Sequence, residues 1–128
     1  SGVCRADPEL RQGQQLAMNV LQVNGQRIAL DKEGYLLDLN DWSPAIAQAL
    51  AEREHLPLSA EHWEVLQLLR DFYREYQLSP ATRPLIKYVA LHLGVDKGNS
   101  LHLNRLFQGT PAKLAAKLAG LPKPTNCL

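Results

Sequence analysis

The sequence predicts one α+β domain that is mainly helical, with a small N-terminal β-hairpin packed on about five helices and an extended C-terminal arm. Three observations lead to this prediction. Two short apolar runs flank Asn24-Gly25, the dipeptide best suited to a two-residue hairpin turn. After Ser43, apolar residues recur mostly at the three- and four-residue spacing of helices. Pro122 and Pro124 follow the last helical segment and exclude a further helix, which leaves the end of the chain extended.

Strand signals lie in the first part of the domain. The runs VLQV from Val20 and QRIAL from Gln26 predict the two strands of the hairpin. A second turn signal, Asp31 to Gly34, precedes YLLDL, which we expect to add a short third strand before Asn40. Two or three strands are only marginally stable alone in water, so we expect them to pack against helices.

Helix signals fill the rest of the chain. Serine, threonine and asparagine often cap helix N-termini, proline suits the first helical position, and glycine often ends a helix. These residues divide the remaining apolar stripes into separate helical segments. The expected helices run from Ser43 to the break at His55–Pro57, from Ser59 to about Tyr76, from Ser79 to Gly94, from Asn99 or Ser100 through Phe107, and from Thr110 to Gly120.

The chain divides into three parts by its patterning. Residues 1–17 are polar, contain Pro8 and Gly13 and lack sustained periodicity, so we expect a disordered leader or the remnant of a purification tag. The natural domain is then expected to begin near Met18 and to span residues 18–120. Residues 121–128 are expected to form a mobile arm that carries a cysteine.

Composition excludes several classes of protein. A chain of 128 residues with 45% hydrophobic and 21% charged residues is a single globular domain and not a disordered protein. The net charge of +1 provides no overall attraction to nucleic acid or to an anionic membrane. No apolar run approaches a membrane span and no secretion signal is recognised, so we expect a cytoplasmic protein with no membrane partner. The oligomeric state is left open.

The cysteines and histidines do not form a metal or disulfide pattern. Cys4 lies in the leader, is expected to be inert, and is far in sequence from Cys127, so the two do not make the framework of a small secreted domain. The four histidines lack the spacing of a metal motif. We therefore expect neither a metal nor another cofactor.

Cys127 is the residue best placed to take part in a reaction. It stands next to the C-terminus, after two prolines, where a thiol contributes little to packing. An extended arm of about six residues at ~3.1 Å per residue would carry its sulfur roughly 15 to 20 Å into a partner's pocket. On position alone, an incidental surface cysteine is the alternative interpretation.

Several motifs together resemble one known family. They are GYL at Gly34, SxEHWEVLQLLRDFY from Ser59, SPATRPLIKYV from Ser79, KGNS at Lys97, RLF at Arg105 and AGLPKPTNC from Ala119. Over about residues 20–128, in this order, they resemble the DsrC/TusE family. The resemblance implies a small helical protein with a β-hairpin and a mobile C-terminal arm, whose penultimate cysteine carries sulfur as a persulfide. Cys127 is that residue here.

The resemblance also separates two branches of the family. Dissimilatory DsrC proteins have a second cysteine eleven positions before the penultimate one, and Ala116 occupies that position here. The chain thus resembles the TusE branch, a sulfurtransferase that takes sulfur from a TusBCD-like complex. That branch passes the sulfur to an MnmA-like tRNA thiolase, with tRNA, for 2-thiouridine at the wobble position. The resemblance implies no cofactor.

Persulfide chemistry needs a thiolate, and a free cysteine with a pKa of ~8.5 is only a few per cent ionised at neutral pH. A nearby cation would raise that fraction. The alternative for each candidate is a solvated side chain or a surface ion pair. The candidates for stabilising the thiolate or contacting a partner are Lys123 on the arm and Arg83, Lys87, Lys113 and Lys117 on helices that would face a folded-back arm.

Two other functions compete with the sulfur carrier. The helices around Ser79–Leu93 and Ser100–Phe107 are spaced like a DNA-binding helix-turn-helix, but the second of them carries only one cation, Arg105. A DsrC-like partner of sulfite reductase is disfavoured by Ala116. The sulfur carrier is therefore the preferred interpretation.

Overall fold

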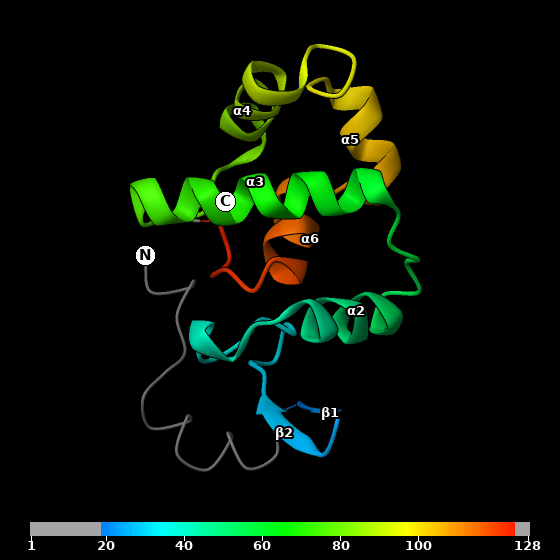
Figure 1. The fold of residues 1–128 in the computed structure, drawn as a ribbon, viewed down its shortest axis with the longest axis vertical. Coiled ribbons are helices and arrows are strands. Elements are labelled where there is room, and N and C mark those ends of the chain that lie inside the picture. The colour runs from blue at the N-terminus through cyan, green and yellow to red at the C-terminus, as the bar shows by residue number, and fades with distance from the viewer. Residues whose placement is uncertain (1–18, 125–128) are drawn as a thin grey trace.

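The structure, a computed structural model, describes residues 19–124. A two-stranded hairpin lies at one end of the molecule, helices α4 and α5 lie at the other, and α3 crosses between them (Figure 1). The predicted hairpin and helices are confirmed. The elements are β1 (Val20–Val23), β2 (Gln26–Ala29), the short 3₁₀ helix η2 (Leu39–Asp41), α2 (Pro44–Arg53), α3 (Ala60–Tyr76), α4 (Thr82–Leu93), α5 (Ser100–Leu106) and α6 (Pro111–Leu118).

The hairpin forms as its turn signal predicts. Strands β1 and β2 are antiparallel, and Asn24 and Gly25 both have positive φ, as a type I′ turn requires. Leu21 pairs with Ile28, and both are buried. One face of the hairpin therefore packs on the helices.

The third strand predicted for YLLDL is wrong. Only one isolated bridge forms there, between Leu30 and Leu36. The chain then turns into η2, because the Asp38 side chain accepts a hydrogen bond from the Asn40 backbone N–H and starts a helical turn. Local capping thus competes successfully with strand pairing.

The helix caps lie close to the predicted positions. Ser43 and Asn99 accept backbone hydrogen bonds at the starts of α2 and α5. Ser59 begins α3 in a capping box with His62, whose Nδ1 accepts from the Ser59 backbone N–H. Helix α4 begins at Thr82, three residues later than the sequence predicts. None of the helices in residues 19–124 has the length and apolar composition that a membrane crossing requires.

Helix α6 lies at the centre of the fold, between α2 and α3 (Figure 1). It is the most buried helix relative to its length: six of its eight residues are buried, including Leu114 and Leu118. This position explains why the segment that follows α6 contacts so many other elements.

Candidate functional site

The end of α6 is where the arm begins, and it is tightly packed. Gly120 has φ +76, and a Cβ added to it would lie 2.3 Å from the Trp42 side chain. The position therefore requires glycine both for its backbone conformation and for space. Leu121 follows, is buried, and donates its backbone N–H to the carbonyl of Ala116.

Two side chains from distant elements hold the last carbonyls of this turn. Trp42 Nε1 donates to the Leu118 carbonyl at 2.9 Å, and Arg70 Nη1 of α3 donates to the Ala119 carbonyl at 2.7 Å. The Arg70 guanidinium carbon also lies 4.0 Å from the centre of the Trp42 ring. A cation at a helix C-terminus interacts favourably with the helix dipole. The end of α6 is thus fixed by a stacked Trp–Arg pair.

The chain stays attached after the helix has ended. The buried Ser79 hydroxyl, between α3 and α4, donates to the Pro122 carbonyl at 2.6 Å. Lys123 Nζ lies 3.0 Å from Glu33 Oε2, an exposed pair of the kind that contributes little stability. Pro124 is buried. Of the segment predicted as a mobile arm, residues 121–124 are therefore packed on the domain, and its mobility stays a prediction.

A cavity of about 380 Å³ opens beside Pro124, between the start of α4 and α6. Its charged lining residues are Arg83 and Lys113, both exposed. Within residues 19–124 neither side chain has a carboxylate partner. The cavity therefore carries positive charge that no described group neutralises.

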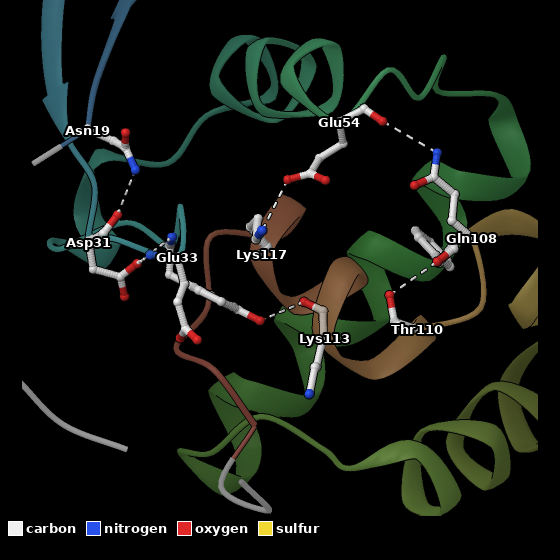
Figure 2. Close-up of polar contacts among 10 residues, drawn as sticks. Asn19, Asp31, Glu33, Glu54, Gln108, Thr110, Lys113 and Lys117 are labelled. Carbon is white, nitrogen blue, oxygen red and sulfur yellow. Dashed lines mark hydrogen bonds and ion pairs between the residues drawn. The ribbon is translucent and has the colours of Figure 1, made fainter. Parts of the chain in front are cut away.

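A cleft on the other side of α6 is lined by three lysines, Lys113, Lys117 and Lys123. Figure 2 shows the first two of them. Lys117 Nζ lies 3.0 Å from Glu54 Oε2 and 5.4 Å from the centre of the Tyr35 ring. The Lys113 side chain extends away from this ion pair (Figure 2). The cleft thus differs from the cavity, because two of its three lysines, Lys117 and Lys123, are paired with the carboxylates of Glu54 and Glu33.

Tyr35 connects the hairpin region to α6. Its hydroxyl donates to the Lys113 carbonyl at 3.0 Å, and its side chain is buried. Burial, and then the nearby carboxylates of Glu33, Asp31 and Glu54, raise the pKa of Tyr35 well above its usual range. The phenol therefore acts as a neutral donor at all ordinary pH values.

Burial also shifts the pKa of Arg70, in the opposite direction to that of Tyr35. Burial, followed by repulsion from Arg74, lowers the pKa of Arg70 from its ordinary value. Arginine stays charged even so, because its ordinary pKa is above 12. Its hydrogen bond to the Ala119 carbonyl is therefore charge-assisted.

Cys127, the central predicted residue, lies outside the described residues, as do Cys4 and the predicted leader. Covalent geometry still limits its position. Three peptide units separate its Cα from that of Pro124, which is at most about 11 Å. The cavity lined by Arg83 and Lys113 is thus within its reach.

The structure divides the five predicted cations into three sets. Arg83 and Lys113 share the cavity beside Pro124, whereas Lys117 and Lys123 are paired with Glu54 and Glu33. Lys87 is exposed on α4 and lines neither the cavity nor the cleft. Within the part of the chain that the structure describes, Arg83 and Lys113 are the two of these five cations that line the cavity and have no carboxylate partner.

Trp42, Arg70 and Ser79 are the residues that sequence analysis missed. Each contacts the end of α6 or the arm across more than 40 residues of sequence. One signal was present: Ser79 opens the SPATRPL motif and yet does not cap the helix that follows it. A serine that is released from capping is available for another hydrogen bond.

In the described residues, the features that would indicate a DNA-binding motif or a metal site are weak. Helices α4 and α5 are joined by a turn, but the outer face of α5 exposes Leu101 and a single cation, Arg105. Among residues 19–124, no group of three histidine, cysteine or acidic side chains gathers in a way that would hold a metal ion. Neither observation supports a DNA-binding or metal site.

Residues 22–128 match the family described as DsrC like protein. The chain belongs to this family. The match includes Cys127. A sulfurtransferase TusE homolog of Haemophilus influenzae is 51% identical over 109 residues, which are 85% of this chain and 100% of the relative. Sulfurtransferase TusE of Salmonella choleraesuis is 50% identical over the same shares of the two chains.

Solved structures of the family agree with the fold. The NMR structure of Allochromatium vinosum DsrC matches with a TM-score of 0.79 and 48% identity, covering 86% of this chain and 98% of that one. The oxidized gamma-subunit of dissimilatory sulfite reductase (DsrC) from Archaeoglobus fulgidus matches with a TM-score of 0.76 and 35% identity, covering 86% and 100%. The family relationship supports a sulfurtransferase role for this chain, in a sulfur relay.

Proposed function

We propose that the chain carries sulfur as a persulfide on Cys127, taking it from a TusBCD-like complex and passing it to an MnmA-like tRNA thiolase for 2-thiolation of the wobble uridine. The observation that carries this proposal is the cavity beside Pro124. It holds two cations without described partners, Arg83 and Lys113, within the covalent reach of Cys127. Cations near a thiol favour its thiolate.

Both transfer steps are exchanges between sulfur atoms. In loading, the Cys127 thiolate attacks the terminal sulfur of a donor persulfide, a new S–S bond forms on Cys127, and the donor leaves as a thiolate. In delivery, the acceptor's thiolate attacks the terminal sulfur on Cys127, and Cys127 leaves as a thiolate again. Nothing is oxidised or reduced overall, so no cofactor is required.

The residue at position 116, an alanine and not a cysteine, favours the TusE-like branch over the DsrC-like branch. This side chain is completely buried in α6, where its methyl group belongs to the hydrophobic core. Since no second thiol stands at this position, Cys127 has no intramolecular partner there for a disulfide. Its sulfur is therefore available to a partner protein, and a tRNA-modifying acceptor places the reaction in the cytoplasm.

Intact-mass analysis tests the proposal. The protein is incubated with a cysteine desulfurase, cysteine and the upstream relay proteins, and we expect a gain of ~32 Da that a thiol reductant reverses. Cys127→Ser should abolish the gain without lowering the melting temperature. Cys4→Ser is the matched control and should load normally. Loading of Cys127→Ser at the wild-type rate would show that another residue carries the sulfur.

A further inference from the structure

We infer that the corner between α4 and α5, residues 91–101, is a docking surface for a partner protein that presents apolar side chains inside an acidic rim. Under the proposed function, on which this assignment rests, that partner is the sulfur donor. The corner lies at the end of the molecule opposite the hairpin (Figure 1). It belongs wholly to the part of the chain that the structure describes.

The corner exposes large apolar side chains. Leu91, Val95 and Leu101 are 79%, 73% and 67% exposed, the three highest values among the large hydrophobic residues that the structure describes. Isolated exposed apolar residues are ordinary on protein surfaces. Three of them within eleven residues form a group, and exposed apolar groups typically mark interaction sites. The corner is therefore a candidate interface.

The KGNS motif holds the turn that carries Val95. The Asn99 side chain donates to the carbonyls of Val95 and Asp96 at 2.8 and 2.9 Å, and it accepts from the His102 backbone N–H at 2.9 Å. It thus ties the turn to the start of α5, whose second residue is Leu101. A preformed surface has little conformational entropy to lose on binding, which favours affinity.

The same motif packs the turn against two other helices. Lys97 Nζ lies 2.8 Å from Glu64 Oε1 of α3. A Cβ added to Gly98 would clash with the backbone of Ala90 in α4, so only glycine allows this close approach. The persulfide chemistry proposed above does not use this motif. Its structural effect is to present the apolar side chains of the corner in a fixed arrangement.

The charges around the corner indicate an acidic partner. Lys87 lies one helical turn before Leu91, and Arg105 lies one turn after Leu101, on the same helix faces. Among residues 19–124, neither cation has a carboxylate partner. Asp96 is the one acidic residue in 87–105. The rim is therefore net positive, and a complementary partner carries Asp or Glu around its own apolar residues.

Charge also ranks the possible occupants of the corner. A tRNA-binding acceptor needs cationic surface for phosphates, which the cationic rim would repel, so the sulfur donor is the better complement. An anionic membrane is disfavoured, because Asp96 lies within the apolar group and two cations supply little attraction. A symmetric dimer would place the like-charged rims of two copies against each other. We therefore assign the corner to the donor.

Binding is measured in a Cys127→Ser background, so that affinity is separated from sulfur exchange. Against the TusBCD-like complex, we expect Leu91→Ser/Val95→Ser/Leu101→Ser to raise the Kd at least about 10-fold, because three apolar side chains lose their contacts. The matched control is Val20→Thr/Leu37→Ser, which changes two exposed apolar side chains near the hairpin and should keep the Kd. Both variants should keep the melting temperature.

The cationic rim is tested by charge reversal. Rim charges act mainly on the rate of encounter, so Lys87→Glu/Arg105→Glu should slow association with the complex about 10-fold at low salt. The difference should shrink at about 0.5 M salt. Loss of the Lys87 charge alone should leave the final extent of loading unchanged. An association rate that charge reversal does not alter would overturn the acidic rim of the partner.

The remaining results also decide the inference. No binding of the complex by the wild-type surface overturns it, and so does an equal Kd for the triple variant and the control. Weaker binding to the MnmA-like thiolase, with unchanged binding to the donor, overturns it as well. With an unchanged donor Kd, triple-variant loss of binding to phosphatidylcholine–phosphatidylserine vesicles would assign the corner to a membrane. Loss of a concentration-dependent dimer would assign it to a second copy.

A small sulfur donor separates this inference from the proposed function. Polysulfide needs no docking, so the triple variant with Cys127 intact should take up sulfur from it at the wild-type rate, while loading from the complex slows. Slower uptake from both sources would overturn the docking role. If the wild-type protein takes up sulfur from neither source, the persulfide proposal fails, and the Kd values still show whether the corner binds the complex.

Discussion

The two sides of α6 carry similar cations in different electrostatic settings. In the cleft toward the hairpin and α2, Lys117 is paired with Glu54 and lies over Tyr35. In the cavity toward α4, Arg83 and Lys113 have no carboxylate partner among the described residues. A paired lysine stabilises the fold, whereas an unpaired cation is available to an anion from outside.

Under the proposed function, this difference gives Lys117 a structural role and Arg83 and Lys113 a chemical one. Lys117 is only 17% exposed at its side chain, and losing it would leave Glu54 without its cation. Lys113 is on the same helix, one turn earlier, and its side chain extends the other way (Figure 2). The side chains around Lys113 and Lys117, more than the residue type that they share, distinguish their expected roles.

The largest expected effect is on the thiol itself. In Arg83→Gln/Lys113→Gln we expect the pKa of Cys127 to rise, because two cations that favour the thiolate are gone. Alkylation by iodoacetamide at pH 7 should slow about 3- to 10-fold. The matched control, Lys87→Gln/Arg105→Gln, changes the net charge equally but away from the cavity. Equal rates in the two double variants would remove the distinction between the two sides.

A smaller effect is expected on stability from the paired side. Lys117→Met should lower the free energy of unfolding by about 1 kcal/mol, because the half-buried Glu54 carboxylate loses its partner. Urea denaturation measures this change, and alkylation of Cys127 should stay at the wild-type rate. Lys117→Met/Glu54→Gln should recover part of the loss. Slower alkylation of Cys127 in Lys117→Met would instead show that this lysine acts on the thiol.

On the side of α6 that carries the ion pairs, Tyr35 should make the stability of the fold depend on pH in the alkaline range. Since the folded state raises the pKa of Tyr35 above its ordinary value of 10.0, the unfolded chain loses this proton first as the pH rises. Stability from this group is therefore complete below pH 10 and declines above it. The urea midpoint should fall as the pH rises above 10, and fall less steeply in Tyr35→Phe. A parallel decline in both proteins would assign the effect to other groups.

The smallest effect is expected from cations outside both sites. Lys87→Met should change neither the urea midpoint nor the alkylation rate, because Lys87 is exposed and lines neither the cavity nor the cleft. Intact-mass loading checks the same variant for function. A measurable loss of loading would extend the chemical surface along α4.

Local sequence signals predicted the elements well. Ser43, Ser59 and Gly94 begin or end helices where their own backbone preferences place them. The failure at YLLDL has a local cause too, because Asp38 caps a 3₁₀ turn that competes with strand pairing. The apolar run at YLLDL favours a strand, and the cap that Asp38 provides prevails over it.

The site was only partly predictable, because its contacts are distant in sequence. Position and motif were enough to single out Cys127 and the five cations. The pairing of Lys117 with Glu54 spans 63 residues, and that of Ser79 with Pro122 spans 43. No local period encodes such contacts. Tertiary structure alone separates the lysines that have carboxylate partners from the cations that do not.

The indole of Trp42 gives the protein an internal optical reporter. It donates to the end of α6, stacks on Arg70 and fills the space beside Gly120. The chain has only two tryptophans, so Trp63→Phe would leave Trp42 as the single emitter. Its emission wavelength and lifetime depend on the adjacent charge and on water access. Partner docking can therefore be followed at the root of the arm by fluorescence, without attaching a dye to the thiol.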